Sequence, residues 1–193
     1  MRDLPRIGIP ARGVRGTEAR PQDPETPVVA AAQAGDRVAF EALYLRHQPA
    51  ACRTATFLLG SSSEAEDAVQ AAFLAAWRGL GTFRLGAPFR PWLYAILRHE
   101  VARVLRERPH LSAGDASEHA EADRTSDAEM HLALKGLDLP QREAVVLHYV
   151  LDVPLREVAH MCGVPVNTVK SRLRLARAKL ARLLAVPGGG GDA

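Results

Sequence analysis

The chain lacks most of the features that mark secreted, membrane-bound or disulfide-rich proteins. Only two of its 193 residues are cysteines, and Cys52 and Cys162 both fall within apolar helical patterns, which favours buried free thiols. No run of about 18 apolar residues occurs, and the first residues include arginines without the apolar core of a signal peptide. We therefore expect a protein of the reducing cytoplasm that is neither exported nor inserted in a membrane.

Motifs for catalysis and metal binding are also missing. The sequence has no glycine-rich phosphate loop, no nucleophile elbow and no C-x-x-C or H-E-x-x-H spacing. His99 or a serine among residues 61–63 is conceivable as a catalytic group, but scattered histidines on helices are usually structural or surface groups. His148, His160 and Cys162 lie near one another without the spacing of metal ligands. We expect no enzyme activity, no metal and no cofactor.

Acidic residues are absent from two long stretches, although the formal net charge is only +3. One stretch covers residues 158–191 and the other residues 69–99. The first contains Lys170, Arg172, Arg174, Arg177, Lys179 and Arg182, and the second contains Arg78, Arg84, Arg90 and Arg98. Solvent-facing helices ordinarily mix both signs of charge, so the two stretches indicate two surfaces for nucleic acid.

Residues 153–184 have the pattern of a helix-turn-helix followed by a long basic helix. A short helix precedes Gly163-Val164-Pro165, where glycine can close a helix and proline cannot continue it. The next helix has an apolar stripe at spacings of three and four residues, formed by Val166, Val169, Leu173, Ala176, Leu180 and Leu183. Its opposite surface carries donors and positive charge, as a major-groove helix requires. The alternative is a helical hairpin with a solvated basic face.

The chain before this motif has the periodicity of further helices. Residues 28–34 predict a short helix, and Asp36 is a suitable N-cap for the next helix, which Pro49 kinks or restarts. Ser63 has the capping-box spacing to Glu66 and predicts the start of another helix. A long helix is expected over residues 92–107, opened by Pro91.

The segment between the last two of these helices, residues 79–89, is an unusually apolar loop. Its aromatic residues Phe83 and Phe89 favour a loop that folds back on a core. Arg84 and Arg90 interleave with them, however, and this mixture is typical of surfaces that stack and hold unpaired bases. The sequence leaves both interpretations open.

Composition divides the chain into segments. We expect a disordered basic arm over residues 1–27, a first helical domain over 28–108 and a flexible acidic linker over 109–127. A second helical domain over 128–186 contains the helix-turn-helix, and a disordered tail covers 187–193. The predicted fold class is all-α, with two small helical domains.

A series of short motifs follows one order along the chain. They are Phe40-Glu41-Ala42-Leu43-Tyr44, Ala65-Glu66-Asp67-Ala68-Val69-Gln70 with Phe73, Ala76-Trp77-Arg78, Phe83-Arg84, Phe89-Arg90, Trp92-Leu93-Tyr94, Leu139-Pro140, Arg142-Glu143, Val164-Pro165-Val166 and Thr168-Val169-Lys170-Ser171-Arg172-Leu173. In this order and spacing they resemble the motifs of the bacterial extracytoplasmic-function (ECF) sigma factors of RNA polymerase. The resemblance implies a subunit without catalytic chemistry that binds core RNA polymerase, directs it to particular promoters and assists their opening.

That resemblance assigns roles to residues of the first domain. An Asp and a Gln on the second helix of such proteins bind the polymerase clamp, and here they are Asp67 and Gln70. The following loop and long helix capture unpaired bases of the minus-ten promoter element. The matching residues are Phe83, Arg84, Phe89, Arg90, Trp92, Arg98, His99 and Arg103. An anti-sigma factor is a further partner that the resemblance implies.

The second domain of such proteins reads the minus-thirty-five element in duplex DNA. Lys170, Ser171 and Arg174 match its reading positions, whereas Asn167, Thr168 and Arg172 match phosphate contacts. A free-standing dimeric helix-turn-helix regulator would also explain residues 128–184, but it would not explain the basic aromatic loop. A helical adaptor that binds only protein is disfavoured by the acid-free stretches.

Three residues depart from the family's pattern. Ala71 stands where a Glu usually follows the Gln, which removes one clamp contact. Asn167 replaces a common Gly at the start of the recognition helix. Leu175 replaces a frequent Arg and offers an apolar group to a thymine methyl. We expect a lower polymerase affinity and an unusual minus-thirty-five preference.

Overall fold

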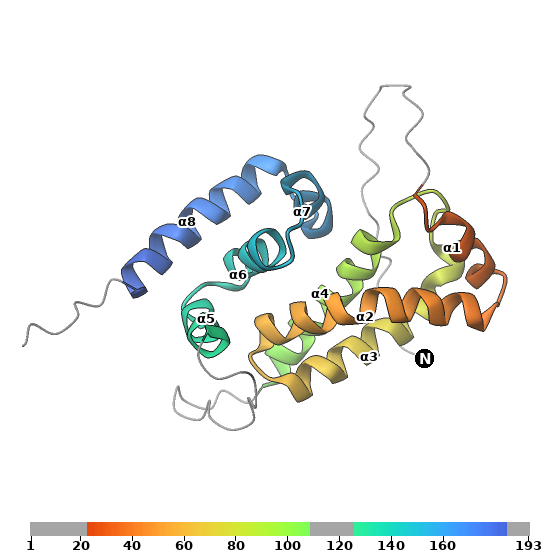
Figure 1. Cartoon of the computed structure of the whole chain (residues 1–193), viewed down its shortest axis with the longest axis horizontal. Coiled ribbons are helices and arrows are strands. Elements are labelled where there is room, and N and C mark those ends of the chain that lie inside the picture. The colour runs from red at the N-terminus through yellow and green to blue at the C-terminus, as the bar shows by residue number, and fades with distance from the viewer. Residues whose placement is uncertain (1–22, 109–125, 185–193) are drawn as a thin grey trace, which may run out of the picture.

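The computed structural model describes residues 23–108 and 126–184, and within these ranges all regular structure is helical (Figure 1). The first domain contains α1 (Thr26–Gln33), α2 (Arg37–Leu59), α3 (Ser62–Gly79), the short 3-10 helix η1 (Leu80–Thr82) and α4 (Phe89–Glu107). The second contains α5 (Ser126–Lys135), α6 (Leu139–Val145), the π-helical segment η2 (Val146–Val150), α7 (Leu155–Cys162) and α8 (Val166–Leu184). The predicted all-α fold with two helical domains is confirmed. Most of the predicted arm, linker and tail lies outside the described residues.

Several helix ends follow from local chemistry that the sequence already indicated. The Asp36 carboxylate accepts hydrogen bonds from the backbone N–H groups of Val38 and Ala39, at 2.9 and 3.2 Å, and so caps α2 as predicted. Gly163 closes α7 with φ of 67°, a left-handed conformation that glycine adopts without steric cost. The turn of the helix-turn-helix therefore lies where it was expected.

Other boundaries differ from the prediction. Of the two alternatives for Pro49, a kink or a restart, the restart is excluded, because α2 continues through this residue. Proline removes one backbone hydrogen bond, while buried residues on both sides of it hold the helix. The N-cap of α3 is Ser61, whose Oγ accepts from Glu64 N at 3.4 Å, so the capping position lies before Ser63.

The first and fourth helices also begin earlier than predicted. Helix α1 starts at Thr26, ahead of the predicted start at residue 28. Helix α4 starts at Phe89, which places Pro91 inside its first turn. Proline is tolerated there because the first N–H groups of a helix have no partner within the helix.

Each domain has apolar residues buried between its helices. The core of the first domain includes Leu43, Leu58, Val69, Phe73, Leu97 and Val101, and that of the second includes Leu134, Leu147, Val158, Val169 and Leu173. Cys162 is buried, Cys52 is half-buried, and both thiols are free. Within the described residues no helix is long and apolar enough to cross a lipid bilayer.

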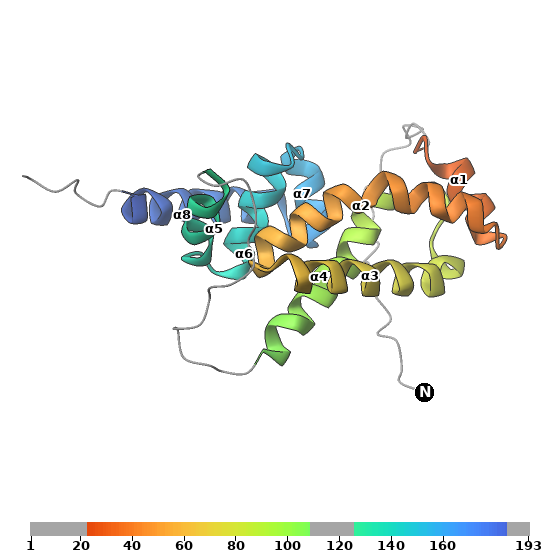
Figure 2. The same cartoon turned by 60° about the horizontal axis from the view of Figure 1, so that its bottom comes forward.

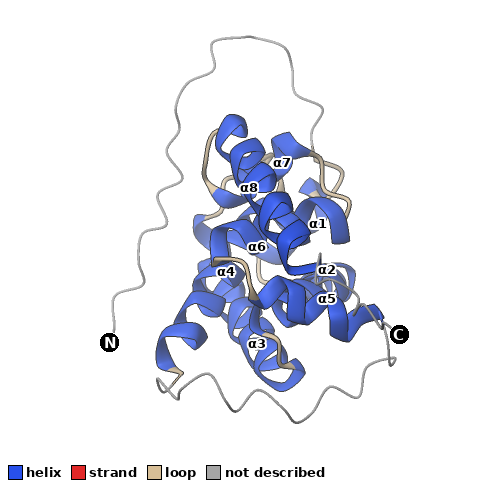
Figure 3. Cartoon of the chain, turned by 90° about the vertical axis from the view of Figure 1, so that its left-hand side faces the viewer, coloured by secondary structure: helices blue, strands red, loops and turns tan. Residues whose placement is uncertain are grey.

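The two domains lie against each other rather than apart (Figure 2). Helix α7 packs against α4, and α6 and η2 pack against α2. Figure 3 shows the same arrangement from the side, with α6, α7 and α8 above α3 and α4. The guanidinium of Arg142 on α6 donates to the carbonyl oxygen of Leu58 on α2, at 2.7 Å. This closed arrangement determines which of the predicted site residues face solvent.

Candidate functional site

Helix α8 presents the predicted recognition surface to solvent along one edge of the molecule (Figure 1). The exposed members of the predicted set are Asn167, Lys170, Ser171, Arg174 and Leu175, while Thr168 and Arg172 are half-buried. On the opposite side of the helix, Val169, Leu173 and Ala176 are buried against the rest of the second domain. The sequence stripe and the structure therefore agree on which face of α8 is free to enter a groove.

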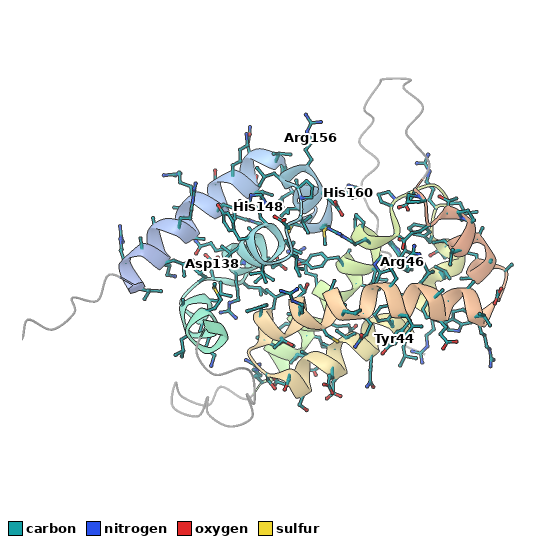
Figure 4. The ribbon with its side chains drawn as sticks, viewed as in Figure 1. Tyr44, Arg46, Asp138, His148, Arg156 and His160 are labelled. Atoms are coloured by element: carbon teal, nitrogen blue, oxygen red, sulfur yellow. The ribbon has the colours of Figure 1, made fainter. Side chains whose placement is uncertain are left out.

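His148 and His160 of the second domain lie on different elements and do not form a metal site. His148 lies on η2, where its Nδ1 is 3.0 Å from the carbonyl oxygen of Val153, and His160 lies on the separate helix α7 (Figure 4). Arg156 extends from α7 away from the body of the protein (Figure 4). No group of three His, Cys, Asp or Glu side chains in the described part of the chain is placed to hold a metal ion.

A shallow apolar groove of about 310 Å³ lies between α2 and α3. It is lined by Phe40, Tyr44, Gln70, Phe73, Leu74 and Trp77. Tyr44 lies on the side of α2 next to α3 (Figure 4), and its ring centroid is 4.7 Å from that of Phe73. Gln70, predicted to bind polymerase, borders the groove, and Asp67 is exposed one helical turn earlier.

Sequence reasoning missed the apolar part of this groove. Leu74 is 56% exposed, although it lies in a helix whose other large apolar residues are mostly packed. Phe40 and Trp77 are likewise only half-buried, with ring centroids 4.8 Å apart. The position of Leu74 four residues after Gln70 was the available signal, because residues four apart share a helix face.

The loop between α3 and α4 folds back on the core through its two phenylalanines. Phe83 is 7% exposed and Phe89 is fully buried, with ring centroids 5.9 Å apart. Trp92 is half-buried, and its ring lies 4.9 Å from that of Phe83. In this conformation the aromatic residues predicted to stack on bases instead support the loop from beneath. Arg84 and Leu85 form its exposed surface.

Three arginines of the predicted minus-ten set are paired with carboxylates. Arg90 Nε lies 3.0 Å from Glu157 of α7, and Arg98 Nε lies 2.8 Å from Glu143 of α6. Arg103 contacts Glu100 and Glu107 of its own helix, at 2.8 and 2.7 Å. Two of the ion pairs therefore cross from the first domain to the second.

The Arg98 pair belongs to a buried polar cluster between the domains. Glu143 is only 1% exposed, and this burial raises the pKa of its carboxyl despite the opposing effect of Arg98. Burial also raises the pKa of Tyr94 well above its ordinary value and that of the Cys162 thiol to about 12, so both stay neutral. Glu143 Oε2 and the Tyr94 hydroxyl have no hydrogen-bond partner within the described structure.

Comparison with known proteins identifies two consecutive families of domains. The model of Sigma-70 region 2 matches residues 43–109, and that of Sigma-70 region 4 matches residues 127–180. The ECF RNA polymerase sigma factor SigM of Mycobacterium tuberculosis is 40% identical over 186 residues, covering 93% of this chain and 93% of SigM. The chain belongs to the ECF sigma factors. Like other sigma factors, it acts in transcription initiation, binds RNA polymerase and promoter DNA, and is not an enzyme.

Other sigma factors share the fold. The RNA polymerase sigma factor CnrH of Cupriavidus metallidurans is 30% identical over 183 residues, covering 85% of this chain and 96% of CnrH. The structure of CnrH in complex with the cytosolic domain of CnrY matches with a TM-score of 0.72, 31% identity and coverage of 84% of this chain and 98% of CnrH. The sigma factor RpoE of Bartonella quintana, solved with the anti-sigma factor NepR, matches with a TM-score of 0.65, 29% identity and coverage of 77% and 98%.

Proposed function

We propose that this ECF sigma factor directs core RNA polymerase to promoters through two separate readers. Helix α8 reads the minus-thirty-five element in the major groove, and the loop and α4 hold unpaired bases of the minus-ten element. The observation that carries the proposal is the exposed, acid-free face of α8, opposite a buried apolar stripe. A helix of this kind combines the charge for phosphates with donors for base edges.

The two kinds of contact on α8 contribute differently. Lys170, Arg174 and the half-buried Arg172 supply positive charge, which attracts phosphates whatever the sequence. Base contacts from Lys170, Ser171 or Arg174 discriminate between sequences by about 1–3 kcal/mol for each good bidentate pair. Leu175 is 48% exposed on the same helix and offers an apolar contact to a thymine methyl.

The minus-ten reader assists opening because bases held by the protein no longer pair with the template strand. Arg84 and Leu85 at the loop surface, together with His99 on α4, are exposed and available to a single strand. The remaining predicted minus-ten residues are Phe83, Phe89, Arg90, Trp92, Arg98 and Arg103. Phe83 and Phe89 support this proposal indirectly, since their buried rings fix the loop that carries Arg84.

Core polymerase occupies the groove between α2 and α3 in this proposal. Its apolar lining and the exposed Leu74 offer a docking surface for a helix, while Asp67 and Gln70 on the rim supply polar contacts.

An anti-sigma factor is the second protein partner that we infer, because CnrH and RpoE were both solved with partner proteins, the latter with an anti-sigma factor. Such a partner would cover both domains. Binding to core RNA polymerase and to promoter DNA would both take place in the cytoplasm, where we expect the protein to act.

Run-off transcription tests the proposal directly. Purified chain and core polymerase are incubated with a library of genomic promoter fragments, and the transcripts are compared with those of core polymerase alone. We expect transcripts from a small set of promoters that share both elements. Absence of promoter-specific transcripts together with absence of core binding would contradict the proposal. Strong binding to a palindromic duplex without polymerase would favour the dimeric regulator instead.

A further inference from the structure

The tip of the loop between α3 and α4 is a short exposed turn with two buried ends. Arg84, Leu85, Gly86 and Pro88 are exposed, whereas the flanking Phe83 and Phe89 are buried. Within the tip, Ala87 N donates to Arg84 O at 3.1 Å, and Gly86 adopts φ of 81°. The direction in which Arg84 and Leu85 project therefore depends on how the two ends of the turn are held.

The first end is held by one side chain from α1. Gln33 Nε2 donates to the carbonyl oxygen of Leu80 and to that of Phe83, both at 2.7 Å. These oxygens come from residues three apart in the chain, so a single amide group uses both of its hydrogens to fix the approach to the turn. Gln33 lies some fifty positions earlier in the sequence and is half-buried.

The second end is held by the residues just before α1. Asp23 Oδ2 accepts a hydrogen bond from Phe89 N at 3.3 Å, and Asp23 Oδ1 accepts from Glu25 N at 2.9 Å. Helix α4 has no side-chain cap from its own N-cap residue, Pro88. Asp23 thus satisfies a backbone donor at the start of α4 and ties it to the same N-terminal segment that carries Gln33.

This N-terminal segment is itself fixed to the core. Glu25 is 7% exposed, and its carboxylate lies 2.9 Å from His47 Nε2 and 3.0 Å from Arg46 Nη1 of α2. The His47 ring in turn lies 5.3 Å from that of Phe89. Burial alone would raise the pKa of Glu25, but its interactions with His47 and Arg46 lower it by more. The net pKa is below the ordinary value, so the carboxylate stays charged and paired.

We propose that Gln33 and Asp23 are positioning residues for minus-ten recognition: they hold the exposed turn at residues 84–88 in the orientation that accepts an unpaired base. The inference rests on the proposed minus-ten function of this loop. Neither residue needs to touch DNA. Their effect is on discrimination, because a recognition loop held loosely contacts right and wrong bases with similar geometry.

The test compares Gln33→Ala with Gln48→Ala in run-off transcription. Gln48 is a matched control, since among the described residues its amide donates only to Cys52 Sγ on the same helix, at 3.3 Å. Templates carry either the preferred minus-ten sequence or single-base changes in it. We expect Gln33→Ala to lose about 10-fold in discrimination between these templates, as loosened positioning predicts. Binding to a minus-thirty-five duplex and the Tm of the variant stay near those of the wild type.

Further variants separate the hydrogen bonds from a general effect on the fold. Gln33→Lys keeps donors for both carbonyl oxygens and is expected to recover part of the discrimination, whereas Gln33→Glu places a carboxylate against them and is not. Equal losses in the Ala and Lys variants, unchanged discrimination in Gln33→Ala, or a loss that extends to duplex binding would each overturn the proposal. A wild-type protein that gives no promoter-specific transcript would instead contradict the proposed function.

A second inference rests on the contacts between the domains. The carboxylates of Glu143 and Glu157, both in the second domain, occupy the guanidinium groups of Arg98 and Arg90 in the first. A guanidinium engaged by a carboxylate cannot offer the same hydrogen bonds to a DNA phosphate or base. The recognition face of α8 remains exposed in the same structure. The closed arrangement therefore engages two arginines of the minus-ten reader and leaves the recognition face of α8 free.

We infer that the closed form is an autoinhibited state of the free subunit, in which Glu143 and Glu157 mask the minus-ten arginines. The test is the double variant Glu143→Gln with Glu157→Gln, compared with Glu41→Gln and Glu66→Gln. The control removes the same charge from exposed positions of the first domain.

Binding to a fluorescein-labelled single strand with the minus-ten sequence is measured by anisotropy, without polymerase. Small-angle scattering reports whether the domains separate. We expect the double variant of Glu143 and Glu157 to expand and to bind the single strand at least about 10-fold more tightly than the control, as release of two guanidinium groups predicts. A double variant that stays compact would show that these ion pairs do not hold the domains together. One that expands without binding the single strand more tightly would show that they do not mask the minus-ten arginines.

Discussion

Arg98 on α4 donates from Nε to Glu143 Oε1 on α6 across 2.8 Å, and this bond joins the two domains of the ECF sigma factor. The partners differ in their surroundings, because the Arg98 side chain is 42% exposed and that of Glu143 only 1%. Removal of the arginine therefore affects the buried carboxylate more than removal of the carboxylate affects the arginine.

This asymmetry gives a prediction for a double-mutant cycle. Arg98→Ala is expected to lower the free energy of unfolding by about 1–3 kcal/mol, because it leaves a buried carboxylate without a donor. In a Glu143→Gln background the same substitution should cost less than half as much, since no buried charge remains. Chemical denaturation of the four proteins measures the coupling. Additive costs would show that the pair contributes nothing specific.

The raised pKa of Glu143 predicts a pH dependence of stability opposite in sign to that of a carboxylate whose pKa is lowered by folding. Burial keeps the folded-state pKa above the ordinary value of 4.5, so between these two values the folded protein binds more protons than the unfolded chain. Stability should fall as pH rises through this window and then level off. The charged or titratable groups that face Glu143 are Arg98, Tyr94, Cys162 and Arg172.

The comparison that isolates this effect is between the wild type and Glu143→Gln. The difference in their free energies of unfolding should change in favour of Glu143→Gln as pH rises above 4.5. Urea denaturation at a series of pH values provides the measurement. A difference that stays constant with pH, or that changes in favour of the wild type, would contradict the assignment.

Polymerase binding should depend on the apolar groove as well as on its polar rim. Leu74→Asp places a charge among Phe40, Phe73 and Trp77 and is expected to weaken core binding at least about 10-fold, the effect of losing one buried apolar anchor. Asp67→Ala should weaken it less. Leu45→Asp is the matched control, because Leu45 is 65% exposed and does not line the groove. Equal affinities for the Leu74 and Leu45 variants would exclude the groove.

The recognition helix provides the fourth prediction. Arg174→Ala should reduce discrimination between right and wrong minus-thirty-five duplexes by about 1–3 kcal/mol if Arg174 contacts a base. Arg182→Ala, in the last turn of α8, should weaken all duplexes alike. Leu175→Arg should make the fall of log affinity with log salt steeper, by the amount that about one further phosphate contact gives. Binding curves at several salt concentrations distinguish these outcomes, and identical behaviour of the two alanine variants would place Arg174 on phosphate.

The features that local sequence predicted are those decided within a few residues. Asp36 caps α2, Gly163 closes α7, and the stripe through Val169 and Leu173 is buried. Each cap, helix end and buried stripe depends on the position of a residue within its own helix, so the neighbouring residues in the sequence suffice to predict it. The order of the family's motifs extended this to the domain organisation and to the family itself.

The features that sequence could not determine depend on contacts between distant residues. The interpretation of Phe83 and Phe89 stayed open, because only the packing of Trp92 and His47 around them decides that they are buried. The family resemblance assigned Arg98 to DNA, whereas its ion pair needs Glu143 of the other domain. The role of Gln33 left no local signal, since the two carbonyl oxygens that it contacts belong to a separate loop.

The support that α1 gives to the loop also bears on how this protein can be divided. The family match to region 2 begins at residue 43, inside α2 and after both Asp23 and Gln33. A polypeptide cut there would keep every first-domain residue assigned to DNA or polymerase, but its loop would be released at both ends and its groove would lack Phe40. Functional dissection of the first domain should therefore start no later than Asp23.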